Sequence, residues 1–272
     1  MKALILCYHC VKDEMNSYLR PTTVADFDRQ MQYLSTRYCP MSLERMVQCL
    51  TSRATLPSKA VAVTFDDGYQ DNHTNAYPVL RKHRIPATVF LATNFIGTGE
   101  IPAWEEGHYT GKKALMLSWE QVREMSDGGI AFGSHTLSHP FLTRIPRKQC
   151  QWEVCRSKEM IEQQIGKPVT MFAYPSGDFN SRTREVVREA GYRAAVSIRA
   201  GGNRPDDDIY ALHRNVIQLP TVYHKVFPVS FLAEITGGVG HVRTMYYRMR
   251  SSRCQDIAAS WRNRKTRAGV KS

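Results

Sequence analysis

Residues 60–69 read Ala-Val-Ala-Val-Thr-Phe-Asp-Asp-Gly-Tyr, and this stretch says most about the fold. Its first six residues form a short β-branched run bounded by polar residues, which predicts a buried strand. Asp66 and Asp67 follow directly. Adjacent carboxylates at the end of a buried strand repel each other and lose hydration, so a fold tolerates them best beside a cation or an arginine. The alternative is a solvated turn, because Asp-Gly is a common turn pair.

Strands alternate with helices along most of the chain. Hydrophobic periodicity and capping residues predict strands at 3–8, 60–65, 87–92, 130–133, 169–173, 192–198 and 211–217, and helices at 24–38, 42–50, 70–84, 118–128, 147–165 and 181–190. This alternation predicts an α/β fold with a parallel sheet or a (β/α) barrel. Chemistry in such folds lies just beyond the carboxyl ends of the strands.

A second cluster of polar residues follows the predicted strand at 130–133. His135 and His139 are four residues apart, a spacing that places two imidazoles on one face of a helical turn, within reach of one metal ion. Taken alone, two histidines at this spacing bind a metal ion in only a minority of cases. Its position after a strand end matches that of the two aspartates, and Asp, His and His together form a three-ligand site with an open position. A catalytic zinc or similar divalent ion needs that arrangement.

Three segments resemble the signatures of one known family. They are Thr64–Tyr69, Ser134–His139 and Phe172–Gly177, in that order, and they are similar to the motifs of the polysaccharide deacetylases with a NodB-homology domain. Leu6–His9 is similar to the subgroup that acts on poly-N-acetylglucosamine-type exopolysaccharides. The likeness covers roughly residues 1–220 and implies a distorted (β/α) barrel of about seven parallel strands. We expect a catalytic domain over residues 1–236 and a basic tail over 237–272.

The resemblance also implies roles for individual residues. Asp67, His135 and His139 are expected to bind a divalent ion, with zinc favoured over cobalt, nickel or iron, and Asp66 is expected to act as the general base. The backbone N–H of Ser176 is the implied oxyanion donor. The expected substrate-binding residues are Tyr174, Pro175, Ser176 and Arg214.

The chain departs from the family pattern in two places. The third motif usually begins with an arginine that orients the base, and Ala173 stands there; we hypothesise that Arg214 supplies the charge from the next strand. The family's last motif is an apolar strand that ends in a histidine acting as general acid. No segment of this chain matches that motif clearly. His9, at the end of the first strand, is favoured for the active site over His213, which stands inside its predicted strand. The competing interpretation of His9 is a core histidine bonded to a backbone carbonyl.

These residues and the resemblance together predict a metal-dependent hydrolase that releases acetate. The substrate, an N-acetylhexosamine-containing glycan or glycan precursor, is implied by the resemblance alone. Trp104 and Tyr109, in the glycine-rich loop 94–117, are candidates for stacking on sugar rings, although aromatic residues in loops more often pack locally. One alternative function is a metal amidohydrolase of the same fold that opens a small cyclic amide. Another is a glycan-binding protein without activity, because two motifs are incomplete.

The net charge of +12 raises nucleic acid as a partner, but its distribution argues against one. Residues 237–272 hold nine lysines and arginines and one acidic residue, which leaves the first 236 residues with a net charge of +4. We expect the tail to be solvated, with contact to an anionic membrane face as the alternative. Seven scattered cysteines, the absence of an 18-residue apolar run and a short N-terminal apolar run predict reduced thiols and a cytoplasmic location.

Overall fold

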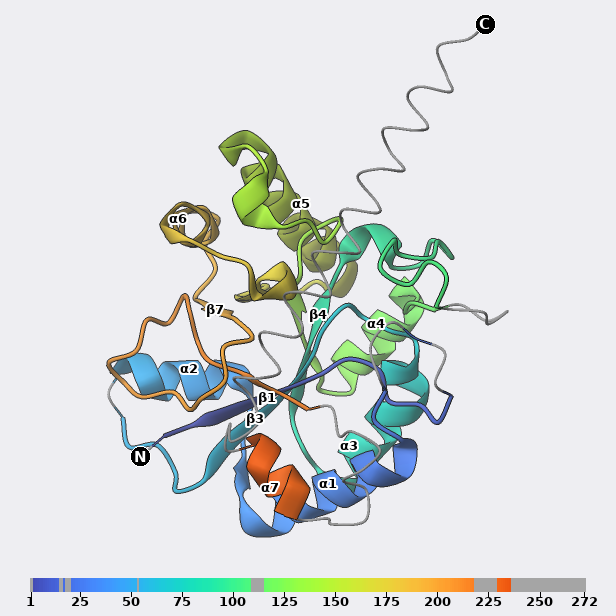
Figure 1. Ribbon diagram of the computed structural model, residues 1–272, viewed down its shortest axis with the longest axis vertical. Coiled ribbons are helices and arrows are strands. Elements are labelled where there is room, and N and C mark those ends of the chain that lie inside the picture. The colour runs from blue at the N-terminus through green and yellow to red at the C-terminus, as the bar shows by residue number, and fades with distance from the viewer. Residues whose placement is uncertain are drawn as a thin grey trace, which may run out of the picture.

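The computed structural model describes residues 2–14, 17, 21–52, 54–108, 115–217 and 229–235 (Figure 1). The predicted tail, 237–272, and Tyr109 lie outside these residues. Among the described helices, none is long and apolar enough to cross a membrane.

A parallel sheet forms the centre of the molecule. Its strands follow the order β7-β6-β5-β4-β3-β1-β8, and the two-residue β2 pairs with β3. All the pairings between named strands are parallel. The strands are β1 (Leu4–Tyr8), β2 (Cys39–Pro40), β3 (Ala60–Phe65), β4 (Ala87–Leu91), β5 (Ala131–Ser134), β6 (Met171–Ala173), β7 (Ala194–Val196) and β8 (Asn215–Val216). The seven strands of this path confirm the predicted α/β class and its distorted barrel.

The chain after β7 brings the two edges of the sheet together. Leu212 forms a parallel bridge with Val196 of β7. A few residues on, β8 pairs with Leu6 and Cys7 of β1. This closing segment is more irregular than the strand predicted at 211–217, because its hydrogen bonds are shared between two partners that lie far apart in the sequence.

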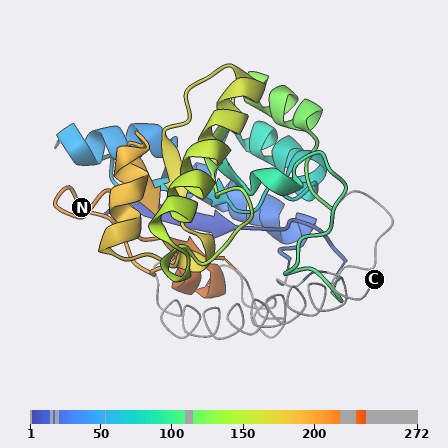
Figure 2. The same ribbon diagram turned by 90° about the horizontal axis from the view of Figure 1, so that it is seen from above.

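Helices cover the outside of the sheet (Figure 2). They are α1 (Val24–Arg37), α2 (Leu43–Ser52), α3 (Tyr77–His83), α4 (Trp119–Asp127), α5 (Arg147–Ile165), α6 (Ser181–Glu189) and α7 (Val229–Ile235). Local signals set several bounds: α4 begins at a capping box on Ser118, and α5 ends at Gly166 in the left-handed conformation. The predicted helix at 70–84 is divided into a π-helical turn, Asn72–Ala76, and α3.

Alternate residues of the strands face two different apolar clusters. Leu6, Val63 and Phe65 pack into the larger one, which contains residues of α1, α3, α4, α5, α6 and α7. Ile5 and Ala62 face the other cluster, together with Phe90 and residues of α2. Because both faces of β1 and β3 are covered, the polar residues that follow these strands are held rigidly at one end of the sheet.

Candidate metal centre and catalytic site

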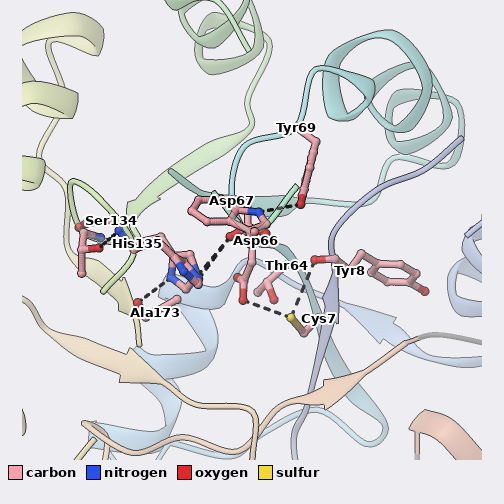
Figure 3. A network of polar contacts seen from close by, with 12 residues as sticks. Cys7, Tyr8, Thr64, Asp66, Asp67, Tyr69, Ser134, His135 and Ala173 are labelled. Carbon is pink, nitrogen blue, oxygen red and sulfur yellow. Dashed lines mark hydrogen bonds and ion pairs between the residues drawn. The ribbon is translucent and has the colours of Figure 1, made fainter. Parts of the chain in front are cut away.

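The candidate site lies at the carboxyl ends of the central strands, where the alternation of strands and helices predicts it. Asp66 and Asp67 follow β3, and His135 follows β5 (Figure 3). Backbone hydrogen bonds extend the sheet slightly beyond the strands: Asp66 N donates to Tyr8 O at 3.0 Å and His135 N donates to Leu91 O at 2.9 Å. The two clusters, about seventy positions apart in sequence, are therefore fixed at the same end of the sheet, where the strands have their carboxyl ends.

Asp67, His135 and His139 converge on one point. The Oδ1 atom of Asp67 lies 3.5 Å from His135 Nε2 and 3.6 Å from His139 Nε2. One ligand atom from each residue lies within 4.8 Å of the other two. A backbone turn directs the carboxylate, since Asp67 has φ 73° and Gly68 has φ 84°. This grouping is the one that the resemblance implies for the metal ligands.

The environment of Asp67 fits a bound cation. Its Oδ1 atom is buried and has no hydrogen-bond partner among the described residues. Burial first, and then repulsion from Asp66, raises the pKa of Asp67 well above its ordinary value. A divalent ion satisfies the orphaned oxygen and offsets both effects, and two imidazoles with one carboxylate form a donor set that suits zinc.

Both histidines present neutral imidazoles to this point. Burial lowers the pKa of His135 and lowers that of His139 further. His135 Nδ1 lies 2.8 Å from the carbonyl oxygen of Ala173, which orients the ring with Nε2 toward Asp67. Neutral imidazole is the form that binds metals, and a carbonyl contact of this kind fixes the tautomer.

The predicted helical turn between the histidines is wrong. Thr136 and His139 both have positive φ, 69° and 57°, so the segment is an irregular loop. Glu153 of α5 holds it: this carboxylate accepts hydrogen bonds from Leu137 N at 3.0 Å, from Ser138 N at 2.9 Å and from Ser138 Oγ at 2.6 Å. Sequence reasoning missed Glu153, since nothing in a helical glutamate signals which loop it contacts.

Arg214 lies against the second aspartate. Its guanidinium donates to Asp66 Oδ1 and Oδ2, both at 2.6 Å, and both side chains are almost completely buried. Arg214 also donates to the Ser197 carbonyl at 2.8 Å. Burial by itself raises the pKa of Asp66, but Arg214 and, after it, His135 hold that pKa well below its ordinary value. The structure therefore places Arg214 against Asp66, the residue that the hypothesis requires it to contact.

The two candidate histidines for the last motif lie in different surroundings. His9 forms a close group with Cys7 and Asp66, and burial lowers the pKa of His9 to about 4. His213 precedes β8 instead of standing inside a strand, and its Nδ1 lies 3.2 Å from Ala200 O. It lines a separate polar cavity with Phe179. The geometry brings His9 to Asp66, whereas His213 lines the separate cavity.

The third motif forms a tight turn after β6. Pro175–Gly177 is a single 3-10 turn in which Ser176 has φ 54°, and Ser176 is half-buried. Tyr174 is fully buried, and its hydroxyl donates to Tyr210 O at 3.0 Å. Pro175 is also buried. Of the three residues, Ser176 is the one with exposed surface, while the Tyr174 side chain supports the turn from within the core.

The glycine-rich loop reaches the candidate metal ligands through Trp104. The ring of Trp104 lies 4.5 Å from that of His139, and its Nε1 donates to Tyr69 Oη at 3.1 Å. Tyr69 in turn donates to the buried Glu105 at 2.6 Å. Sequence reasoning singled out Trp104 but missed Glu105, whose carboxylate accepts hydrogen bonds from Tyr69 of the first motif and from Ser17.

Comparisons with known proteins agree with this geometry. The polysaccharide deacetylase family model matches residues 53–195. YxkH of Bacillus subtilis (strain 168) is 32% identical over 214 residues, which are 78% of this chain and 70% of that protein. The poly-beta-1,6-N-acetyl-D-glucosamine N-deacetylase of Staphylococcus epidermidis (strain ATCC 35984) is 26% identical over 238 residues, 79% of this chain and 78% of that one.

Among solved structures, the Streptococcus pyogenes deacetylase PplD in complex with acetate matches with a TM-score of 0.72 and 26% identity. The match covers 86% of this chain and 98% of PplD. The chain belongs to the polysaccharide deacetylase family, the hydrolases of carbohydrate esterase family 4 that act on N-acetyl amide bonds.

Proposed function

We propose that the protein is a metal-dependent de-N-acetylase that releases acetate from an N-acetylhexosamine-containing glycan or glycan precursor. One observation carries the proposal: the two consecutive aspartates have opposite partners. Asp67 faces two imidazoles, and Asp66 faces a guanidinium. One carboxylate is thus placed to bind a metal ion and the other to accept a proton. Metal-assisted hydrolysis of an amide by water requires both roles.

We propose that Asp67, His135 and His139 hold the metal ion, with zinc favoured and cobalt, nickel and iron as alternatives. When bound, a divalent ion polarises the acetamide carbonyl and brings the pKa of the attacking water near neutrality.

The remaining residues move and hold protons. Arg214 keeps Asp66 ionised and fixes both of its oxygens, so Asp66 accepts the proton of the attacking water. As the C–N bond of the acetamide breaks, the amine nitrogen takes up a proton and acetate leaves. His9, beside Asp66, is the proposed proton donor or relay for that nitrogen. The N–H of Ser176 is the proposed donor to the developing oxyanion.

The relatives support a substrate with N-acetylglucosamine. The Staphylococcus epidermidis protein is named a poly-beta-1,6-N-acetyl-D-glucosamine N-deacetylase, and PplD is described in complex with acetate. We propose the same class of N-acetylated glycan for this chain.

The test is acetate release from a panel of substrates: β-1,6-linked and β-1,4-linked N-acetylglucosamine oligomers, and a small cyclic amide such as hydantoin. We expect acetate from at least one oligomer, no opening of hydantoin, and a rate at least about 100-fold lower for Asp66→Asn. Ring opening without acetate release would favour the cyclic-amide hydrolase. Oligomer binding by Asp66→Asn and wild type alike, with acetate from neither, would favour a glycan-binding protein.

A further inference from the structure

A second group of metal-type donors lies beside the first. Cys7 and His9 are two residues apart at the end of β1, so they project to the same side of the strand. Tyr8 points to the other side, where its hydroxyl donates to Gln30 at 2.8 Å. In the parallel register Tyr8 pairs with Phe65 of β3, which places the following residue, Asp66, next to His9.

The three donors are close enough to share one ion. One ligand atom each from Cys7, His9 and Asp66 lies within 4.8 Å of the other two. Cys7 Sγ lies 3.4 Å from Asp66 Oδ2. A dashed line marks this contact in Figure 3. A thiolate, an imidazole and a carboxylate form a donor set that favours zinc or cobalt over magnesium or calcium, because thiolate is a soft ligand.

We propose that Cys7, His9 and Asp66 form a second metal site, which takes up a thiophilic divalent ion at higher metal concentration than the Asp67, His135 and His139 site and then inhibits the enzyme. Binding forms bonds from the ion to Sγ, to an imidazole nitrogen and to Oδ2. The proton of the Cys7 thiol leaves to solvent. Thiolate and carboxylate bring two negative charges to the ion and to the guanidinium of Arg214, so the group as a whole keeps one positive charge.

Two features make this site weaker than the first. Arg214 already carries a positive charge against both oxygens of Asp66, so an ion there meets electrostatic repulsion. Cys7 is fully buried and its thiol donates to Asp66 Oδ2 at 3.4 Å, so the ion has to displace a proton that is held between these two side chains. At the Asp67 site the carboxylate faces the two imidazoles, with Oδ1 at 3.5 Å from His135 Nε2 and 3.6 Å from His139 Nε2.

The inhibition follows from the proposed function of Asp66. An ion bound to Oδ2 and His9 occupies the lone pairs that would accept and relay protons. The metal site itself does not depend on that function, since it rests on the positions of the three donors alone.

Cobalt(II) distinguishes the two sites by spectroscopy. The Asp67 site contains no sulfur, whereas cobalt bound to Cys7 gives a sulfur-to-metal charge-transfer band in the near ultraviolet. We expect titration of metal-free full-length protein with cobalt chloride to show visible ligand-field absorption first and the charge-transfer band only after the first equivalent. Cys7→Ser, which retains a hydroxyl donor toward Asp66, should lose the band and the second equivalent of metal. Cys49→Ser, at a buried thiol on α2, should retain both.

Activity gives an independent readout. Excess zinc should inhibit acetate release by wild type, and Cys7→Ser should need at least about tenfold more zinc for half-inhibition. His139→Ala should lose activity and the early ligand-field absorption but keep the charge-transfer band. Circular dichroism and thermal melting verify that each variant is folded. A wild type without the band, or a band of unchanged intensity in Cys7→Ser, would overturn the second site, whether or not acetate is released.

Discussion

At the scale of residues, we propose that Arg214 compensates for the arginine that the third motif lacks. The third motif has Ala173, which carries no charge, and the closing segment of the barrel supplies a guanidinium that binds both oxygens of Asp66, the proposed base. The fork of an arginine matches a carboxylate in a way that the single ammonium of a lysine does not. The orientation of Asp66 therefore depends on the bidentate geometry and not on charge alone.

Arg214→Lys tests that geometry. We expect kcat for acetate release to fall by about 10–100-fold, the usual effect of losing an orienting partner. The zinc content should stay the same, because the guanidinium of Arg214 donates to Thr64, Asp66 and the Ser197 carbonyl and not, among the described residues, to the candidate metal ligands. Arg199→Lys, at an exposed residue over Phe179, is the matched control and should leave kcat unchanged. Equal kcat values for Arg214→Lys and wild type would contradict the assigned role.

Asp71 makes stability depend on pH. Its Oδ1 accepts from Val11 N at 2.9 Å, and burial raises its pKa from 3.8 to about 6. The folded protein thus binds this proton more tightly than the unfolded chain, so the free energy of unfolding falls as pH rises from about 4 to about 6. Asp71→Asn retains the acceptor oxygen and removes the charge. Denaturation with urea gives the free energy of unfolding of the variant minus that of wild type. This difference should be more favourable to the variant at pH 7.5 than at pH 4, by up to about 3 kcal/mol. The same stability difference at both pH values would refute this.

At the scale of elements, the histidine loop depends on α5. Glu153 satisfies two backbone N–H groups and one hydroxyl of that loop. Glu153→Ala should lower the free energy of unfolding by about 1–3 kcal/mol for each N–H left buried without a partner. It should also weaken zinc binding by about 10–100-fold, because His139 loses its support. Glu153→Gln keeps an acceptor and should lie close to wild type in a competitive chelator titration. Zinc affinity equal to wild type in Glu153→Ala would count against the argument.

The elements that the sequence predicted well are those with local causes. The bounds of β3 follow from its β-branched run, and those of α5 from Pro146 and Gly166. The irregular closure through β8 and the loop between His135 and His139 depend on partners far away in the chain, which periodicity does not report. The candidate ligands were predictable because their residue types and spacing form motifs. The contacts of Asp66 with Cys7 and Arg214 become visible only when β1, β3 and β8 lie side by side.

At the scale of the whole molecule, α7 contributes to the fold although the alternation of strands and helices fades before it. Phe231 and Ile235 are completely buried, and Phe231 packs against Tyr33 of α1. Asn215 of β8 donates to Ile235 O at 3.0 Å. The described fold therefore extends to residue 235, close to the predicted domain limit at 236.

Two truncations test this limit. A chain of residues 1–236 should keep the urea midpoint and the turnover of the full chain on a soluble oligomer. A chain of residues 1–217 should lose about 3–6 kcal/mol of the free energy of unfolding, because the burial of Phe231 and Ile235 is lost. Equal stability of the two truncated chains would show that α7 does not support the barrel. A lower midpoint for residues 1–236 than for the full chain would place part of the domain in 237–272.

The most direct test of the central claim is a zinc titration of metal-free protein during acetate release from an N-acetylglucosamine oligomer. The account predicts that activity is absent after chelation, rises linearly with added zinc to one equivalent per chain, and stays absent in Asp67→Asn. Acetate release by metal-free protein at the rate of the zinc-loaded protein, or full restoration of Asp67→Asn by the same equivalent of zinc, would contradict it.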